Sequence, residues 1–95
     1  MSEDDPIRTL RAELSALDER IVEAVNRRLE LVLELKQVKE ERGVGFLDPA
    51  RERWLRTHLG DANRGPLSSE GLDELVTELL ALTKREVGRR EMEQR

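Results

Sequence analysis

The sequence predicts an all-helical fold of three helices: one very long, one short and one of medium length. Charged residues make up 40% of the chain, which has one Trp, one Phe and no Tyr, a composition more typical of helical bundles than of sheets. Residues 5–42 contain no glycine, and their apolar residues recur at heptad spacing. Turn residues at 43–45 and 60–66 divide the chain into three segments. A chain of 95 residues is expected to form a single domain over residues 1–95.

The first helix is predicted over about residues 6–42. Asp5 is its expected N-cap, and Pro6 occupies a first helical position. Two columns run through it at heptad spacing: Ile7, Leu14, Ile21, Arg28 and Leu35 in one, and Leu10, Leu17, Ala24, Leu31 and Val38 in the other. Such a helix would be roughly 55 Å long, and the two columns are typical of a helix packed against another helix.

Two shorter helices follow. The second is predicted over about residues 49–59, after Asp48 as N-cap, and the third over about residues 69–88, after Ser68 or Ser69 as cap. The apolar stripe of the third helix is Leu72, Val76, Leu79, Leu80, Thr83 and Val87. The residues after this stripe lose the pattern and are expected to fray.

The long helix is too long for the other two to cover. Together they would supply roughly 50 Å of rise, enough for one side of the first helix. We therefore expect a homodimer in which the long helices of two chains pack against each other. A monomeric antiparallel bundle is the alternative.

Composition excludes several classes of function. The chain has no Cys and one His, so neither a thiolate nor a His-rich metal site is expected. The net charge of −4 argues against general nucleic-acid binding. No apolar run resembles a signal peptide or a membrane span, so we expect a soluble, cytoplasmic protein without membrane contact.

Arg28 stands where its column calls for an apolar residue. Lys39 lies about three turns further on and only ~20° away around the helix axis, so both face one side. Arg11 is about 100° from Arg28 and roughly 25 Å along the axis, so it could reach only a partner's site, in an antiparallel dimer. A buried guanidinium needs an anion, from the protein or from a ligand. The alternative interpretation is that these cations are solvated or form surface ion pairs.

The sequence offers no Ser-His-Asp or Cys-His arrangement and no glycine-rich phosphate loop. What remains is a pocket inside a helical bundle that binds a small anion. Such a pocket suits a reaction that needs only folding of the substrate and stabilisation of developing charge.

A set of residues resembles the all-helical class of chorismate mutases over nearly the whole chain: Arg11, Leu17-Asp18, Arg28, Lys39, Asp48 and Arg51-Glu52. The resemblance implies an intertwined homodimer of three-helix chains, with two sites each built from both subunits. It also implies a Claisen rearrangement of chorismate to prephenate without a cofactor, on the route to phenylalanine and tyrosine.

The resemblance assigns roles to individual residues. Arg28 and, from the partner chain, Arg11 would clamp the two substrate carboxylates, a task that suits the planar guanidinium. Lys39 would hydrogen-bond the ether oxygen, where negative charge grows. Asp48 and Glu52 would hold the ring hydroxyl. Arg28, Lys39 and Glu52 are thus the expected catalytic residues.

Three more residues complete the expected substrate site. Arg51 would bind a carboxylate or position its neighbouring glutamate. Thr83 and Val87 stand where the best-known members carry a small hydroxyl residue and a glutamine that bonds the ether oxygen. Val87 cannot donate, and losing such a donor costs about 3 kcal/mol of transition-state stabilisation. Either Arg85 compensates, the activity is modest, or the substrate differs.

Other functions stay open at this stage. Relatives of the same fold act on 4-amino-4-deoxychorismate or cleave isochorismate to salicylate and pyruvate. An amine at the ring would suit the acidic pair Asp48 and Glu52. Some short bacterial members are activated by a shikimate-pathway synthase, which makes such an enzyme a candidate partner. A non-catalytic dimerisation or regulatory module is the alternative from another class.

Overall fold

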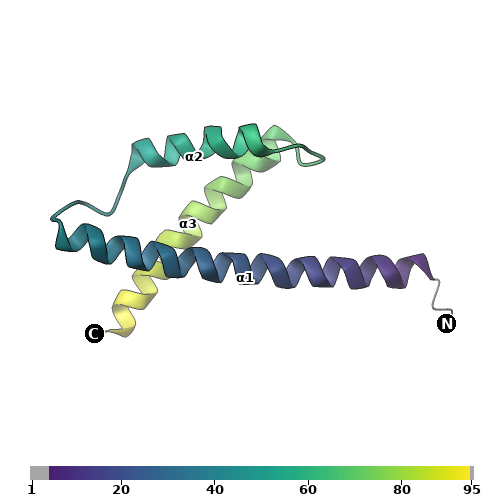
Figure 1. The fold of residues 1–95 in the computed structure, drawn as a ribbon, viewed down its shortest axis with the longest axis horizontal. Coiled ribbons are helices and arrows are strands. Elements are labelled where there is room, and N and C mark those ends of the chain that lie inside the picture. Colours follow the sequence, from purple (N-terminus) through teal and green to yellow (C-terminus); the bar gives the residue numbers. More distant parts are fainter. Residues whose placement is uncertain (1–4, 95) are drawn as a thin grey trace. The chain divides into compact units, whose positions relative to one another are not determined.

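The computed structural model describes residues 5–94, which form three α-helices without a strand among them. They are α1 (Pro6–Glu41), α2 (Pro49–Ala62) and α3 (Ser69–Glu93) (Figure 1). The predicted all-helical class with one very long helix is confirmed. Within the described range, every helix is too short or too polar to cross a membrane.

The chain divides between Val32 and Leu33, inside α1, into two units. The first unit contains the N-terminal part of α1, and the second contains the rest of α1 together with α2 and α3. The single domain expected from the sequence stays a prediction.

Each helix begins at a side-chain cap, as the sequence predicts. A side-chain oxygen accepts a 3.0 Å hydrogen bond from a backbone N–H two or three residues later: Asp5 from Ile7, Asp48 from Arg51, and Ser68 from Gly71. These bonds satisfy N–H groups that the first turn of a helix leaves without a partner. Helix starts are therefore encoded locally.

The C-terminus of α1 is a glycine cap. Gly43 has a φ of +68°, in the left-handed region that glycine adopts without steric cost. Its N–H donates to the Glu40 carbonyl at 3.1 Å, and the Val44 N–H donates to the Lys39 carbonyl at 2.8 Å. This pair of bonds is a Schellman motif. It ends α1 at Glu41, one residue before the predicted end.

Helix α2 extends to Ala62, beyond the predicted end at Leu59. Gly60 does not stop the helix, because the Asn63 N–H still donates to the Leu59 carbonyl at 3.0 Å. The Asn63 side chain then closes the following loop by donating to the Leu67 carbonyl at 2.9 Å. The stop signal is thus Asn63, not the glycine.

Helix α3 continues to Glu93, although the predicted helix ends near Gly88. The added turns carry Glu91, which forms an ion pair with Lys36 on α1. Glycine costs about 1 kcal/mol in a helix interior relative to alanine, and this contact between helices favours continuation. The helix thus includes most of residues 88–95, which we expected to fray; residue 95 lies outside the described residues.

Helices α2 and α3 form an antiparallel hairpin. Arg56 on α2 donates to the Asp73 carboxylate at 2.6 Å and to the Thr77 hydroxyl at 3.0 Å. Glu52, one turn earlier on α2, pairs at 2.9 Å with Lys84, which lies later on α3. Polar contacts therefore connect the two helices along the hairpin.

Burial within residues 5–94 is concentrated in α3. Val76, Thr83 and Val87 are 1%, 6% and 4% exposed, and all three belong to the predicted apolar stripe. In contrast, α1 contains no buried residue. The single chain thus buries few of its apolar side chains.

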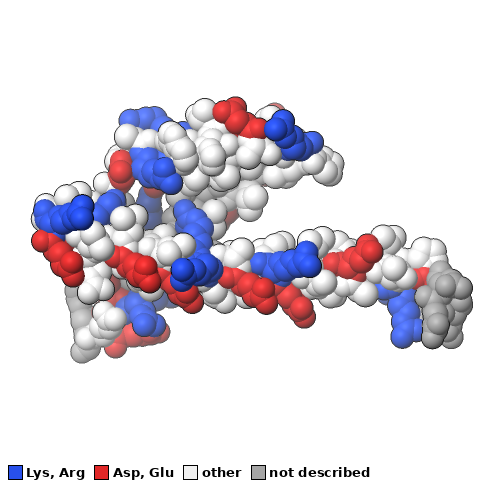
Figure 2. All heavy atoms as spheres, in the orientation of Figure 1, with Lys and Arg blue, Asp and Glu red and all other residues white. Residues whose placement is uncertain are grey.

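The two apolar columns of α1 remain exposed. We call their large members the apolar seam: Ile7, Leu10, Leu14, Leu17, Ile21, Leu31, Leu35 and Val38. Each is between 41% and 60% exposed. Figure 2 shows uncharged residues, drawn in white, at the surface of α1 between basic and acidic side chains. Proteins rarely expose a large apolar stripe of this kind without a function.

Candidate active site

The eight predicted site residues fall in both units of the chain. Arg11 and Arg28 belong to residues 5–32. The other six belong to residues 33–94: Lys39, Asp48, Arg51, Glu52, Thr83 and Val87.

Arg28 is the more enclosed of the two arginines on the first part of α1. It is half-buried, whereas Arg11 is exposed. The adjacent Arg27 points to solvent and pairs at 3.0 Å with Glu30, both side chains being 63% exposed. Arg27 and Arg28 thus differ in exposure, and the less exposed of the two, Arg28, is the one in the apolar column.

Lys39 is held by the loop that follows α1. Its Nζ donates to the Phe46 carbonyl at 3.1 Å and lies 6.0 Å from the centroid of the Phe46 ring. The turn at Gly43 brings this loop back toward the end of the helix. The half-buried ammonium therefore has a fixed donor direction before any ligand binds.

The start of α2 carries three candidate site residues: Asp48 is the N-cap, and Arg51 and Glu52 lie in the first turn. The Asp48 carboxylate accepts from the Arg51 N–H at 3.0 Å, and the Asp48 carbonyl accepts from the Glu52 N–H at 3.1 Å. The Arg51 guanidinium lies 4.0 Å from the centroid of the Trp54 ring, a cation–π contact. The helix cap thus orients the Asp48 carboxylate, and the Trp54 ring orients the Arg51 guanidinium.

Glu52 has a partner that the sequence did not reveal. Lys84 on α3 forms an ion pair with its carboxylate at 2.9 Å, the two side chains being 47% and 32% exposed. An exposed pair of this kind contributes about 1 kcal/mol or less to stability. In the sequence, Lys84 differs from other lysines only in following the candidate site residue Thr83, which does not predict a contact with Glu52.

Thr83 and Val87 are both buried in α3. The Thr83 hydroxyl donates to the Leu79 carbonyl one turn earlier, at 2.7 Å. This back-bonding is the usual role of a threonine in a helix. Arg85, considered above as a substitute donor, is exposed.

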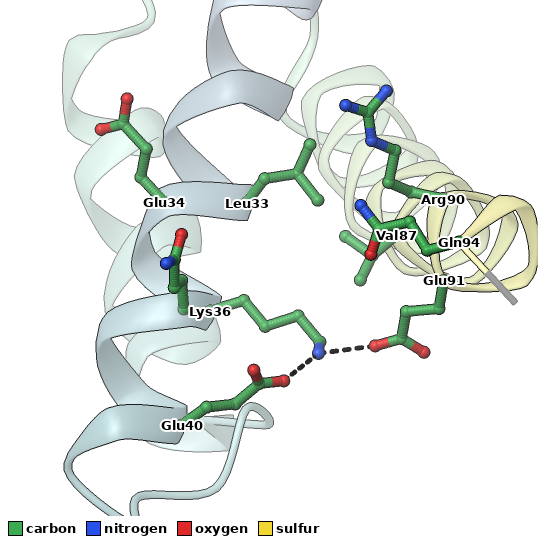
Figure 3. A pocket seen from close by; sticks show the side chains of 9 residues that line it. Leu33, Glu34, Lys36, Glu40, Val87, Arg90, Glu91 and Gln94 are labelled. Atoms are coloured by element: carbon green, nitrogen blue, oxygen red, sulfur yellow. Dashed lines mark hydrogen bonds and ion pairs between the residues drawn. The ribbon is translucent and has the colours of Figure 1, made fainter.

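Val87 lines a pocket of about 500 Å³ between α3 and the last turns of α1 (Figure 3). Leu33 and Val87 supply its apolar side chains, while Lys36 extends between Glu40 and Glu91. Lys39, Asp48 and Glu52 are not among its lining residues. The structure therefore places Val87 beside Lys36 in this pocket.

The pKa of Lys36 is displaced by its two carboxylate neighbours. Hydrogen bonds to Glu40 and, second, to Glu91 raise the pKa of its ammonium. Both carboxylates favour the charged form. Lys36 therefore stays positive throughout the physiological range.

The charged groups suit recognition of a small anion. Arginine and lysine donors lie on α1 and at the start of α2, and the carboxylates of Asp48 and Glu52 accompany them. Across residues 5–94 no three His, Asp or Glu side chains are grouped as a metal ion would require. Side chains of these types are ones that can bind and orient an anionic ligand and stabilise charge that develops on it.

Comparison with known families gives the assignment. The model of one family, chorismate mutase type II, matches residues 10–87. The chain belongs to this family. The matched range contains all eight residues of the candidate site.

Two relatives that this chain matches have different activities in their names. It is 34% identical over 87 residues to a bifunctional chorismate mutase/prephenate dehydratase of Stutzerimonas stutzeri, covering 85% of this chain and 24% of the relative. It is 32% identical over 74 residues to a 4-amino-4-deoxychorismate mutase of Streptomyces venezuelae, covering 78% and 68%. The chain thus spans about a quarter of the length of the bifunctional relative.

Solved chorismate mutase structures share the fold. The form I structure of chorismate mutase from Thermus thermophilus superposes with a TM-score of 0.80 at 28% identity, covering 83% of this chain and 99% of that one. The form II structure gives a TM-score of 0.81 at 27% identity, with 85% and 92% covered. The likeness extends over most of both chains.

Proposed function

We propose that this protein converts chorismate to prephenate by a Claisen rearrangement without a cofactor. The observation that carries the proposal is the family match over residues 10–87, which contains every residue of the candidate site. The reaction is intramolecular, so it needs neither a nucleophile nor a metal from the protein. It gains from a folded substrate and from donors aimed at the oxygen that becomes negative.

Each charged residue takes a role that its position allows. Arg28 and Arg11 of the partner subunit bind the two carboxylates, and Lys39 donates to the ether oxygen as the C–O bond breaks. Asp48 and Glu52 hold the ring hydroxyl. The half-buried positions of Arg28 and Lys39 support these roles, because charge–charge interactions strengthen as water is excluded.

A homodimer with shared sites is part of the proposal. The apolar seam is 41–60% exposed, and covering what remains exposed would contribute about 1 kcal/mol per side chain. A second copy packed along α1 covers the seam. It also brings in an arginine equivalent to Arg11, which lies roughly 25 Å along the helix from Arg28 of the same chain. We place this dimer in the cytoplasm, as the sequence led us to expect.

A second candidate substrate is 4-amino-4-deoxychorismate. The relative from Streptomyces venezuelae carries that activity in its name, and the acidic pair Asp48 and Glu52 supports a cationic ring substituent. The two substrates differ only in the group that this acidic pair would face. Product analysis with each substrate separates the candidates.

Ligand binding tests the anion site directly. A bicyclic ether dicarboxylate that mimics the transition state should raise the melting temperature of the wild type. Arg28→Ala should abolish the rise. Arg27→Ala is the matched control and should keep it, because Arg27 pairs with Glu30 at the surface. A wild type with no rise, or an unchanged rise in Arg28→Ala, would contradict the site.

Mixing two inactive variants tests the sharing of sites. In a heterodimer of Arg11→Ala and Arg28→Ala chains, one site carries both defects and the other carries neither. Equal amounts of the two chains, exchanged at random, should therefore recover about one quarter of wild-type activity. No recovery in a mixture that demonstrably exchanges subunits would place both arginines in the same chain's site.

A further inference from the structure

We propose that Lys84 sets the substrate preference of this site, selecting a ring hydroxyl over a ring ammonium. The inference rests on the proposed function, in which Glu52 faces that ring substituent. Lys84 lies outside the set of residues assigned from the sequence. We assign Lys84 a role because it contacts Glu52.

The contact joins two helices at the candidate site. Lys84 Nζ lies 2.9 Å from Glu52 Oε1. Glu52 stands in the first turn of α2, where the helix dipole also favours a negative side chain. One of its two carboxylate oxygens therefore already has a cation beside it.

This arrangement treats the two substituents differently. A hydroxyl is neutral, so it can donate to the second oxygen of Glu52 while Lys84 stays in place. A protonated amine would bring a second positive charge within a few ångströms of the Lys84 ammonium, and like charges at that distance repel. Specificity here arises from the repulsive element as much as from the attractive one.

Two other charged residues, Asp48 and Arg51, lie close to Glu52 in the chain. The Asp48 carboxylate accepts the Arg51 N–H as the helix cap, so it is partly occupied. The Arg51 guanidinium lies on the same turn, over Trp54. The start of α2 thus adds one anion, Asp48, and one cation, Arg51, which offset each other in net charge. The contact between Lys84 and Glu52 therefore carries the inference.

A purely structural role for the ion pair is the competing explanation. However, the hairpin has a second link, since Arg56 bonds both Asp73 and Thr77. An exposed pair adds little to stability beyond that link. A structural role predicts equal effects on both substrates, whereas a role in selectivity predicts opposite effects.

The ratio of kcat/KM for chorismate to that for 4-amino-4-deoxychorismate tests the inference. Lys84→Met should lower this ratio about tenfold, a modest effect for a like charge a few ångströms away near a surface. Lys84→Arg should restore it, because the charge returns. Arg89→Met is the control: it removes a cation from the same helix, but Arg89 pairs with Glu86 and not with Glu52. Measuring both substrates on one preparation cancels any loss of folded protein.

The outcomes separate the two proposals. An active wild type whose ratio is unchanged in Lys84→Met overturns the inference alone. A fall of the same size in Arg89→Met also overturns it, because the effect would then be one of net charge. A wild type inactive on both substrates overturns the proposed function, and this inference with it.

Discussion

Replacing Val87 with glutamine tests the proposed register of α3, because it adds a hydrogen-bond donor at a position that we propose faces the substrate. The resemblance implies a glutamine at this position, which would bond the ether oxygen of the substrate. One donor of that kind is worth up to about 3 kcal/mol in the transition state, which corresponds to roughly 100-fold in rate. If the proposed register of α3 is correct, Val87→Gln should leave kcat/KM for chorismate unchanged or raise it by up to about 100-fold.

The same substitution should lower stability. Val87 is 4% exposed, so the new amide enters a largely dry position, where an unsatisfied polar group costs about 1–3 kcal/mol. The neighbouring pocket of about 500 Å³ leaves room for the longer side chain, and Lys36 and Glu91 at its edge can bond part of the amide. We therefore expect the free energy of unfolding to fall by about 1–2 kcal/mol.

Two assays on the same protein separate these effects. Initial rates of chorismate consumption report activity, and urea denaturation reports stability. Val87→Met is the matched control, because it has similar length and no donor, so it should give no gain in rate. A loss of tenfold or more in a folded Val87→Gln protein would refute the register. An equal gain in Val87→Met would refute the hydrogen-bond argument.

Three further predictions follow from the charges and the seam. Lys39→Ala should lower kcat at least about 100-fold while size-exclusion chromatography still shows a dimer; near-normal turnover would remove Lys39 from the reaction. Ile21→Glu should give inactive monomers, since Ile21 is 60% exposed in the single chain and lies in the proposed interface. Asn26→Glu, on the opposite face of the heptad, should leave a dimer, and a dimeric Ile21→Glu protein would exclude this seam. Because Glu40 first and then Glu91 raise the pKa of Lys36, its contribution to stability is complete below the ordinary lysine pKa of about 10.4 and is lost as pH rises through the raised value. The Tm difference between wild type and Lys36→Met should thus hold from neutral pH to about pH 9 and disappear in more alkaline solution; disappearance near neutrality would argue against this pairing.

The fold was largely predictable because its signals are local. Asp5, Asp48 and Ser68 cap the helices within three residues of themselves, and Gly43 supplies the left-handed cap of α1. The C-terminal ends of α2 and α3 were less predictable. They depend on Asn63 and on contacts between helices, which periodicity does not encode.

The residues of the candidate site stay a prediction, and the sequence could not predict their contacts. The resemblance supplied the cations and the carboxylates from their order in the chain. It could not show that Lys84 reaches Glu52 across two helices or that Phe46 holds Lys39. Nor could it show that Trp54 is 48% exposed and lies against the Arg51 guanidinium. Contacts between residues that are far apart in the sequence can be seen only in the three-dimensional structure.

Product analysis after incubation with chorismate tests the central claim most directly. The purified protein is mixed with chorismate, and the product is identified by nuclear magnetic resonance before any acid treatment. We expect prephenate, formed at a rate that Lys39→Ala strongly reduces. Chorismate recovered unchanged, or converted to pyruvate and an aromatic acid, would contradict the proposed reaction.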